Sequence, residues 1–359
     1  MIIYTKKEDC CGCGACVVSC SQNAIFMKQD KEGFLYPKIN QSLCKNCNKC
    51  QTVCPIKHSD MQQSRSQFYG ARALDQNIRE RSSSGGIFSL LANYVLKRNG
   101  SVFAAGFDEN MNVVHKEIWK VQDLDSVRRS KYVQSVTGNI FQDILHKLSA
   151  GSWVLFTGTP CQTEALRLYL NKPYARLILA DLICYGASSP GIWKSYIHYL
   201  EKQHDQKILD YYFRDKRNHD NGHMVSWKTK KEEKICSLYS DPYSRMYFQN
   251  LTIRPSCYQC QYCKPHRNSD FTLGDFWGIE KIRPNIDDGM GTSLVIVHTT
   301  KGKQIWEEIR KQCLIFECQE KDALQPRLQT PTKRPWKREL FMQAYKWLPF
   351  SFIMKKFKY

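Results

Sequence analysis

Cysteines form two dense runs near the N-terminus of this 359-residue chain. Each run has the spacing C-x2-C-x2-C-x3-C, and together they comprise Cys10, Cys13, Cys16, Cys20, Cys44, Cys47, Cys50 and Cys54. Three thiolates this close together can surround one iron–sulfur cubane, whereas the fourth is out of reach and ligates the other cluster. The runs therefore predict two 4Fe–4S clusters. The first would take Cys10, Cys13, Cys16 and Cys54, and the second Cys44, Cys47, Cys50 and Cys20.

The double run is typical of bacterial two-cluster ferredoxins, and Pro55 follows its last cysteine as in those proteins. A pair of zinc ribbons is the alternative, but zinc sites pair C-x2-C units and do not need this full run twice. Ser21 replaces the proline after the first run, and Cys11 fits no ligand position. We interpret Cys11 as a bystander and residues 1–60 as a small ferredoxin-type domain.

A third group of cysteines lies far from these runs, in the stretch RPSCYQCQYC at residues 254–263. Cys257, Cys260 and Cys263 are three residues apart, which suggests metal binding. Three ligands do not complete a tetrahedral site. One hypothesis is a site of these three cysteines with a remote fourth ligand such as His266.

The stretch RSSSGGIF at residues 81–88 could bind an anion. It places Ser82, Ser83, Ser84, Gly85 and Gly86 directly before a predicted helix. Serine can cap a helix N-terminus, glycine lets the backbone approach a ligand, and the free amides at a helix start favour negative charge. An ordinary helix cap explains the same residues. The stretch RRSKYVQS at residues 128–135 adds cationic and aromatic groups.

The elements that must position these groups follow from hydrophobic periodicity. Predicted helices cover residues 85–100, 139–148, 162–170, 191–203 and 301–313. Predicted strands cover residues 101–107, 112–119, 153–158, 175–184 and 293–299, and shorter antiparallel ones lie between 208 and 240. This alternation predicts an α/β core with parallel strands in its middle. The fold class is therefore α+β, with a ferredoxin-like domain followed by an α/β domain with a mixed sheet.

The predicted domain boundaries follow composition. Residues 59–67 are polar, so residues 61–70 are predicted to be a linker. Residues 71–320 form the α/β domain, and residues 321–359 form a basic, aromatic C-terminal segment. We expect that segment to bind an anionic surface rather than to complete the core, since it mixes Lys and Arg with Trp and Phe. The alternative is that its apolar side chains pack onto the α/β domain.

Several of these motifs together resemble a known family. SSSGGIFSLLANYVL, SKYVQS, LFTGTPCQTEAL, DLICYGASSPGIW, RPSCYQC and SDFTLGDFWGI occur in this order between residues 72 and 278. The order is similar to that in the beta subunit of coenzyme F-420 (deazaflavin) hydrogenases and dehydrogenases, which a ferredoxin segment often precedes. The resemblance implies binding of FAD and a further 4Fe–4S cluster. It places the flavin on the serines and glycines of residues 82–86 and on Lys131, Tyr132, Val133, Gln134 and Ser135.

The same resemblance implies a different third cluster from the one considered above. Its ligands would be Cys161, Cys184, Cys257 and Cys260, with Cys263 surplus. The predicted strands agree with this set, because Cys161 and Cys184 follow two strands that would bring both thiols to one sheet edge if they are parallel neighbours. One residue departs from the family: Tyr185 stands where a histidine is frequent. The resemblance therefore supports flavin and cluster binding more strongly than it supports deazaflavin.

Composition and charge set the remaining expectations. The N-terminal MIIYTKKEDCC has no apolar signal region, so we expect a cytoplasmic protein. The formal net charge is +19, yet no helix-turn-helix, zinc-finger or RNP-type pattern is present, so nucleic acid is not the expected partner. The charge suits an acidic partner or anionic substrate, and association with a membrane surface is a further hypothesis. A homo-oligomer is compatible with the sequence.

The motifs together predict an iron–sulfur flavoprotein oxidoreductase. Electrons from ferredoxin, flavodoxin or reduced deazaflavin would enter at the ferredoxin-type clusters and reach FAD through the third cluster. The substrate is unidentified, and a small or lipid- or sugar-linked molecule of cell-surface polysaccharide biosynthesis is one hypothesis. The alternatives are an electron-transfer subunit serving a partner enzyme and a deazaflavin-dependent oxidoreductase. No catalytic acid or base is assigned, and Asp275 is expected to cap a turn.

Overall fold

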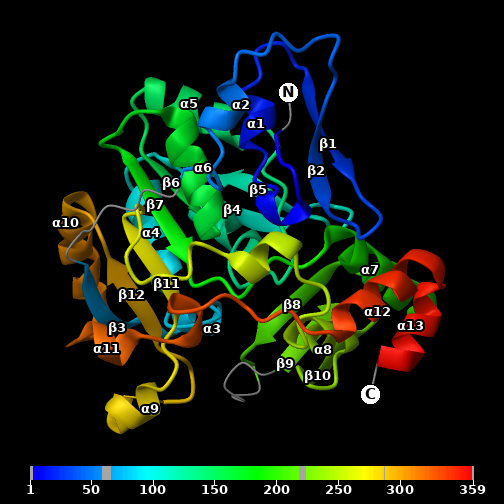
Figure 1. Cartoon of the computed structure of the whole chain (residues 1–359). Helices are drawn as coiled ribbons and strands as arrows, with labels where there is room; N and C mark the ends of the chain where they lie inside the picture. Colours follow the sequence, from blue (N-terminus) through cyan, green and yellow to red (C-terminus); the bar gives the residue numbers. More distant parts are fainter. Residues whose placement is uncertain (1–2, 59–65, 218–223, 287, 358–359) are drawn as a thin grey trace.

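A computed structural model describes residues 3–58, 66–217, 224–286 and 288–357. The N-terminal cysteine runs lie at one end of the molecule, above a large central sheet, and a smaller sheet with the C-terminal helices lies beside it (Figure 1). The N-terminal part contains the antiparallel strands β1 (Ile25–Gln29) and β2 (Leu35–Ile39) and the short helices α1 (Ala15–Val18) and α2 (Lys49–Thr52). Each helix carries the third cysteine of one run.

The central sheet has eight strands in the order β13-β3-β12-β11-β7-β6-β4-β5. In chain order these are β3 (Gln67–Ala73), β4 (Ser101–Phe107), β5 (Val113–Ile118), β6 (Val154–Gly158), β7 (Leu177–Leu182), β11 (Phe271–Asp275), β12 (Ser293–Val297) and β13 (Cys313–Cys318). The four strands β4, β6, β7 and β11 pair in parallel, and every other pairing in this sheet is antiparallel. The predicted mixed sheet with a parallel middle is confirmed.

The predicted linker at residues 61–70 is wrong over its last part. Strand β3 begins at Gln67 and pairs with both β12 and β13, so these residues are inside the sheet. Strand β3 was not predicted because most of its side chains are polar or small, and Phe68 and Tyr69 are its only large apolar residues. The first part of the predicted linker, residues 61–65, lies outside the described residues.

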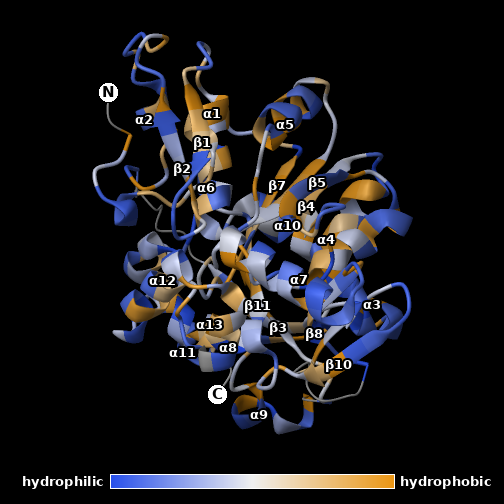
Figure 2. Cartoon of the chain, turned by 90° about the vertical axis from the view of Figure 1, so that its right-hand side faces the viewer, coloured by the Kyte–Doolittle hydropathy of each residue, from blue (hydrophilic) through white to orange (hydrophobic). Residues whose placement is uncertain are grey.

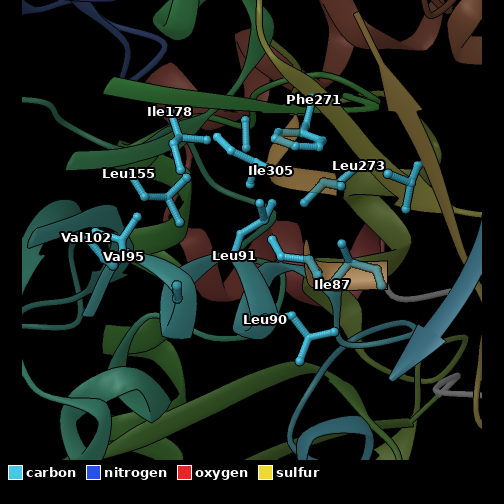
Figure 3. Packing of buried hydrophobic residues seen from close by; sticks show 14 of the residues in the cluster. Ile87, Leu90, Leu91, Val95, Val102, Leu155, Ile178, Phe271, Leu273 and Ile305 are labelled. Carbon is cyan, nitrogen blue, oxygen red and sulfur yellow. The ribbon is translucent and has the colours of Figure 1, made fainter. Parts of the chain in front are cut away.

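Helices cover both faces of the central sheet. They include α4 (Ile87–Leu96), α5 (Ile140–Ser149), α6 (Pro160–Leu170) and α10 (Thr300–Ile309). Side chains of α4 and α10 pack with Val102, Leu155 and Ile178 on one face, as the close view in Figure 3 shows for Ile87, Leu91 and Ile305. On the other face α5 and α6 pack with the neighbouring strand residues, among them Phe103, Phe156 and Leu177. This two-residue alternation is what a sheet buried on both faces requires. Figure 2 shows the resulting hydrophobic colouring on β4 and β7.

A second core lies beside the main sheet. It contains the antiparallel strands β8 (Asp210–Asp215), β9 (Met224–Lys228) and β10 (Glu233–Ser237), and the helices α7 (Pro190–His204), α8 (Pro242–Phe248), α12 (Lys337–Trp347) and α13 (Phe350–Phe357). The expectation that the C-terminal segment stays outside the core is wrong. Phe341, Met342, Ile353 and Met354 are all buried there, because the helices turn one apolar face toward α7 and α8.

The remaining elements are short. They are the helices α3 (Gln76–Glu80), α9 (Ile279–Ile282) and α11 (Glu320–Ala323), and 3₁₀ helices at Lys7–Asp9, Val121–Ser126, Pro255–Gln259, Pro284–Ile286, Arg310–Gln312 and Pro326–Leu328. None of the helices in the described part of the chain has the length and apolar character needed to cross a bilayer.

Candidate redox site

The first predicted ligand set surrounds a small cavity. Cys10, Cys13 and Cys16 are buried and, with Cys54, line that cavity next to Ile3. Burial raises the pKa of Cys16 strongly, and the neighbouring thiols of Cys10 and Cys54 raise it further. Several thiolates brought this close repel one another unless iron offsets their charge. The residues therefore fit a cluster whose fourth ligand comes from the other run.

The second predicted set lies at the outer end of the molecule. Burial raises the pKa of Cys50, and the thiols of Cys44, Cys47 and Cys20 add to the shift. Cys47 is exposed and Cys44 is half-buried. The structure thus brings Cys20 from the first run to the second set, as the crossed arrangement requires, and ligation at both sets remains a prediction.

The third set lies at an edge of the central sheet. Strands β6 and β7 are parallel neighbours, so Cys161, at the start of α6, and Cys184, after β7, come close together. The turn that carries Cys257 and Cys260 closes over this edge. Burial raises the pKa of Cys184, as do the thiols of Cys257, Cys161 and Cys260. The Ala187 amide also donates a hydrogen bond to Cys257 Sγ, at 3.4 Å.

The rival third site with His266 is less well supported by the structure. The Nδ1 atom of His266 lies 2.9 Å from Ser66 Oγ, and its Nε2 atom lies 3.2 Å from a Glu320 carboxylate oxygen. Both ring nitrogens therefore have partners other than sulfur. Cys263 is nevertheless close to the third set, because its thiol shares a hydrogen bond with Cys260 that raises the pKa of Cys263 and lowers that of Cys260.

The three sets do not form compact single-ion sites. Within the described residues, no three His, Cys, Asp or Glu side chains converge closely enough to hold one metal ion. A cubane of four irons and four sulfides is wider than a single ion, so its thiolate ligands stand farther apart.

Cys11 has a role in the arrangement that sequence reasoning missed. Its thiol lies beside those of Cys13 and Cys161, and the interaction with Cys13 contributes most to the raised pKa of Cys11. It therefore lies between the first and third sets, and its interpretation as a residue outside the ligand sets stays a prediction. The sequence could not predict that Cys11 lies near Cys161, because this contact forms only when two distant segments of the chain pack together.

The two predicted flavin segments meet at one point. The Ser130 amide donates a hydrogen bond to Ser83 Oγ, at 2.8 Å. None of the serines caps α4, whose N-cap is Gly86 with φ 91°, and Ser82 Oγ instead donates to the Ile78 carbonyl, at 2.7 Å. The expectation of a serine cap is therefore wrong. Ser84 Oγ is buried and has no hydrogen-bond partner among the described residues, so it could bind an anion.

A lysine that the sequence did not single out contacts this turn. Lys216 Nζ donates to the carbonyls of Ser84, at 2.8 Å, and Met290, at 2.6 Å. Burial lowers the pKa of Lys216 to about 7, and burial has the same effect on Lys131. Asp275 does not cap a turn, as was expected, but pairs with Arg214 at 2.8 Å. A phosphate beside these lysines would favour their charged forms and bind to them.

The end of the second flavin segment points toward the cysteine runs. Gln134 Nε2 donates to the Cys11 carbonyl at 2.8 Å, and Ser135 Oγ accepts a hydrogen bond from Gln162 at 3.1 Å. Val133 lies in the second core, and Tyr132 stacks on Tyr247 with ring centroids 4.9 Å apart. The segment thus extends from the serine–glycine turn to the first cysteine run, and only its start contacts that turn.

Arg254 connects the first and third sets. It is fully buried, and it precedes the turn that carries Cys257. Its Nε donates to the Cys10 carbonyl at 2.7 Å, and an Nη lies 3.7 Å from Cys10 Sγ. Its other Nη donates to Gln134 Oε1 at 2.9 Å. The sequence offered one indication of this role, because Arg254 stands shortly before the predicted metal-binding turn.

Tyr185, the departure from the family pattern, has a structural role. Its hydroxyl donates to Asn250 Oδ1 at 2.6 Å, and its ring packs 5.4 Å from that of Tyr247.

Comparison with known proteins agrees with this geometry. Residues 151–322 match the family model for the C terminus of the beta subunit in coenzyme F420 hydrogenase/dehydrogenase, and residues 9–58 match a "4Fe-4S dicluster domain". Over residues 151–322 the chain is therefore similar to this family of beta subunits. The predicted family is therefore confirmed, although the expected range began earlier and ended earlier than the matched one. The two matches together support an iron–sulfur protein of the oxidoreductase type.

Two relatives illustrate the similarity. The F subunit of the F(420)H(2) dehydrogenase from Methanosarcina mazei is 23% identical over 192 residues, which cover 50% of this chain and 54% of that protein. The chain thus spans about half the length of this curated relative. A structure of the F420-reducing [NiFe] hydrogenase complex from Methanosarcina barkeri contains a chain with 18% identity and a TM-score of 0.46, and the alignment covers 80% of this chain and 91% of that one.

Proposed function

We propose that this chain is an iron–sulfur flavoprotein oxidoreductase with three 4Fe–4S clusters and FAD. The three cysteine sets would hold the clusters, and the serine–glycine turn would hold the flavin phosphates. The clusters supply one-electron steps, and a flavin combines them into a two-electron reduction. The protein's own contribution is to hold these groups in order and to tune them through burial and hydrogen bonds.

The order of the sets is the observation that carries this proposal. The second set includes the exposed Cys47, and Cys10, Cys13 and Cys16 of the first set are buried. The Cys11 thiol lies beside both Cys13 of the first set and Cys161 of the third. This sequence of sets supports entry of electrons at the exposed end and transfer inward. Arg254, which precedes the turn of the third set, contacts Cys10 of the first set.

Aromatic side chains continue the path toward the proposed flavin site. Tyr247 lies near Cys184, whose charge raises the pKa of Tyr247 in addition to the larger effect of burial. The Tyr247 ring stacks on Tyr132, which directly follows Lys131. Tyr247 therefore lies between Cys184 of the third set and Tyr132 of the second flavin segment.

The turn itself is suited to a pyrophosphate. Lys216 contacts the Ser84 carbonyl of the turn, and the Ser84 hydroxyl is available to donate. Helix α4 begins directly after the turn and directs its free amides there. A sugar- or lipid-linked acceptor is supported by the family resemblance alone.

A second candidate function is an electron-transfer subunit that serves a partner enzyme. The name of the Methanosarcina mazei relative favours it, since that protein is one subunit of a dehydrogenase. The use of a deazaflavin donor would fit both candidates.

Anaerobic purification followed by iron, sulfide and flavin analysis tests the cofactor content. We expect the iron and sulfide of three 4Fe–4S clusters together with FAD. Zinc in place of iron, or the absence of flavin, would contradict the proposal. Oxidation of a reductant by the purified chain alone would then favour an enzyme, whereas activity only with an added partner would favour a subunit.

Substitution of Gly86 tests the flavin turn separately. Gly86 has φ 91°, and an added Cβ would lie 2.8 Å from Ile78 Cγ2, so Gly86→Val should distort the turn. We expect lower flavin content with nearly unchanged iron content, both measured on the purified protein. Equal flavin content in the variant and the parent would rule out this site.

A further inference from the structure

Helix α12 is apolar on two opposite faces. Its inner face contributes Phe341 and Met342, both fully buried, to the second core. A helix that covers a core normally presents polar and charged residues on its other side. The outer face of α12 departs from this rule.

Three large apolar side chains form a stripe on the outer side of this helix. Trp336, Leu340 and Trp347 are exposed to 74%, 60% and 73%. Spacings of four and seven residues place them on one face, because an α-helix repeats about every 3.6 residues. Leu348 and Phe352, exposed to 43% and 45%, follow in the connection to α13 and in α13 itself. We call these five residues the outer stripe. The fold does not bury them, and clustered exposed apolar residues mark interaction sites.

Lysines surround the outer stripe. The ammonium groups of Lys337 and Lys31 lie 5.6 Å and 5.3 Å from the rings of Trp336 and Trp347. Lys333 and Lys355 are also exposed. From residue 327 to the end of the chain the sequence has one acidic residue, Glu339, which pairs with Arg334.

We propose that the outer stripe docks on an anionic lipid surface. Tryptophan, leucine and phenylalanine would enter the headgroup region, and the lysines would contact lipid phosphates, as in interfacial amphipathic helices. A protein partner is a poorer match, because lysine is depleted at protein–protein interfaces. This inference goes beyond the proposed function and is independent of which redox partner the chain uses.

Co-sedimentation of the full chain with lipid vesicles tests the proposal. We expect binding to vesicles of phosphatidylcholine with phosphatidylglycerol, weak binding to phosphatidylcholine alone, and release at high salt. The double variant Trp336→Ser/Trp347→Ser should bind anionic vesicles about tenfold more weakly, because it loses the apolar insertion. The matched control is Trp119→Ser/Trp277→Ser, which removes tryptophans exposed to 60% and 55% elsewhere on the surface and should bind like the parent.

Other outcomes would overturn the proposal. Absence of binding to anionic vesicles, or equal loss in the two double variants, would exclude docking through the outer stripe. Concentration-dependent self-association that only Trp336→Ser/Trp347→Ser abolishes would assign the stripe to a second copy of the chain. If that variant proves unstable, Lys337→Glu/Lys355→Glu tests the same face through its charge and should also lose anionic vesicle binding.

Discussion

The two cysteine runs have the same spacing and the same local backbone, yet they lie in opposite surroundings. Gly12 and Gly14 in the first run and Asn46 and Asn48 in the second occupy equivalent positions, and all four have positive φ. Both glycine and asparagine adopt this conformation readily. The use of glycine in the first run and asparagine in the second reflects the neighbours that surround each run.

The first run faces the α/β domain. A Cβ on Gly12 would lie 2.7 Å from both Arg254 Nη1 and Gln134 Nε2, and neither group can move freely because each holds buried carbonyls. The second run faces solvent, so Asn46 has room for its side chain. The comparison shows that equal spacing does not give equal surroundings. We therefore expect the surroundings of each run to set its tolerance to substitution and its redox properties.

The largest expected effect comes from filling the space at Gly12. Gly12→Val adds a β-branched side chain at positive φ and against Arg254, so we expect a loss of stability of about 3 kcal/mol or more. Its matched control, Asn46→Val, carries the backbone strain without the clash and should lose less. Thermal unfolding with iron analysis measures both, and equal losses would show that the two surroundings do not differ in this respect.

The next effect concerns the crossed ligands. Cys20→Ser should alter the cluster of the second run and leave the first intact, because Cys20 lies with Cys50 and Cys44. Cys54→Ser should do the reverse. Electron paramagnetic resonance of the reduced protein distinguishes the two signals. If Cys20→Ser perturbs only the cluster held by Cys10, Cys13 and Cys16, the crossing is wrong.

A smaller, selective effect is expected at Arg254. Arg254→Met retains much of the side-chain volume but removes a positive charge and the hydrogen-bond donor near Cys10 Sγ. Both groups stabilise the reduced cluster, because it carries more negative charge than the oxidised one. The midpoint potential of the first cluster should therefore become more negative, with that of the second unchanged. Arg254→Lys, which retains the charge, should shift it less. A redox titration followed by electron paramagnetic resonance checks this, and equal shifts in both clusters would contradict a local effect.

The smallest effect compares two threonines. Thr137 Oγ1 donates to the buried Cys13 carbonyl at 2.8 Å, and Thr52 Oγ1 donates to the exposed Lys49 carbonyl at 2.9 Å. Thr137→Val should cost about 1–3 kcal/mol, because it leaves a buried carbonyl unsatisfied. Thr52→Val should cost well under that value, since water replaces the lost donor. Chemical denaturation of both variants tests whether burial makes the difference.

Sequence reasoning succeeded where the signal was local. The helices α4, α5, α6, α7 and α10 and the strands β4, β5, β6, β7 and β12 were predicted because hydrophobic periodicity reports burial within one element, whereas the central strand β11 was not predicted. It failed at β3, whose small and polar residues resemble a linker, and at the C-terminal helices, whose charge concealed a buried face. In both cases the partner that buries the residues lies elsewhere in the chain.

By itself, the sequence predicted the ligand sets of the two runs and indicated the similarity to the beta-subunit family. Three ligands of each run lie within seven residues, and the family motifs are short, so neither depends on distant contacts. Only the tertiary structure decided how the sets connect. Arg254 meets Cys10 across 244 residues of sequence, and Lys216 meets Ser84 across 132. No local sequence pattern predicts such contacts, because they depend on how separate elements of the fold pack against one another.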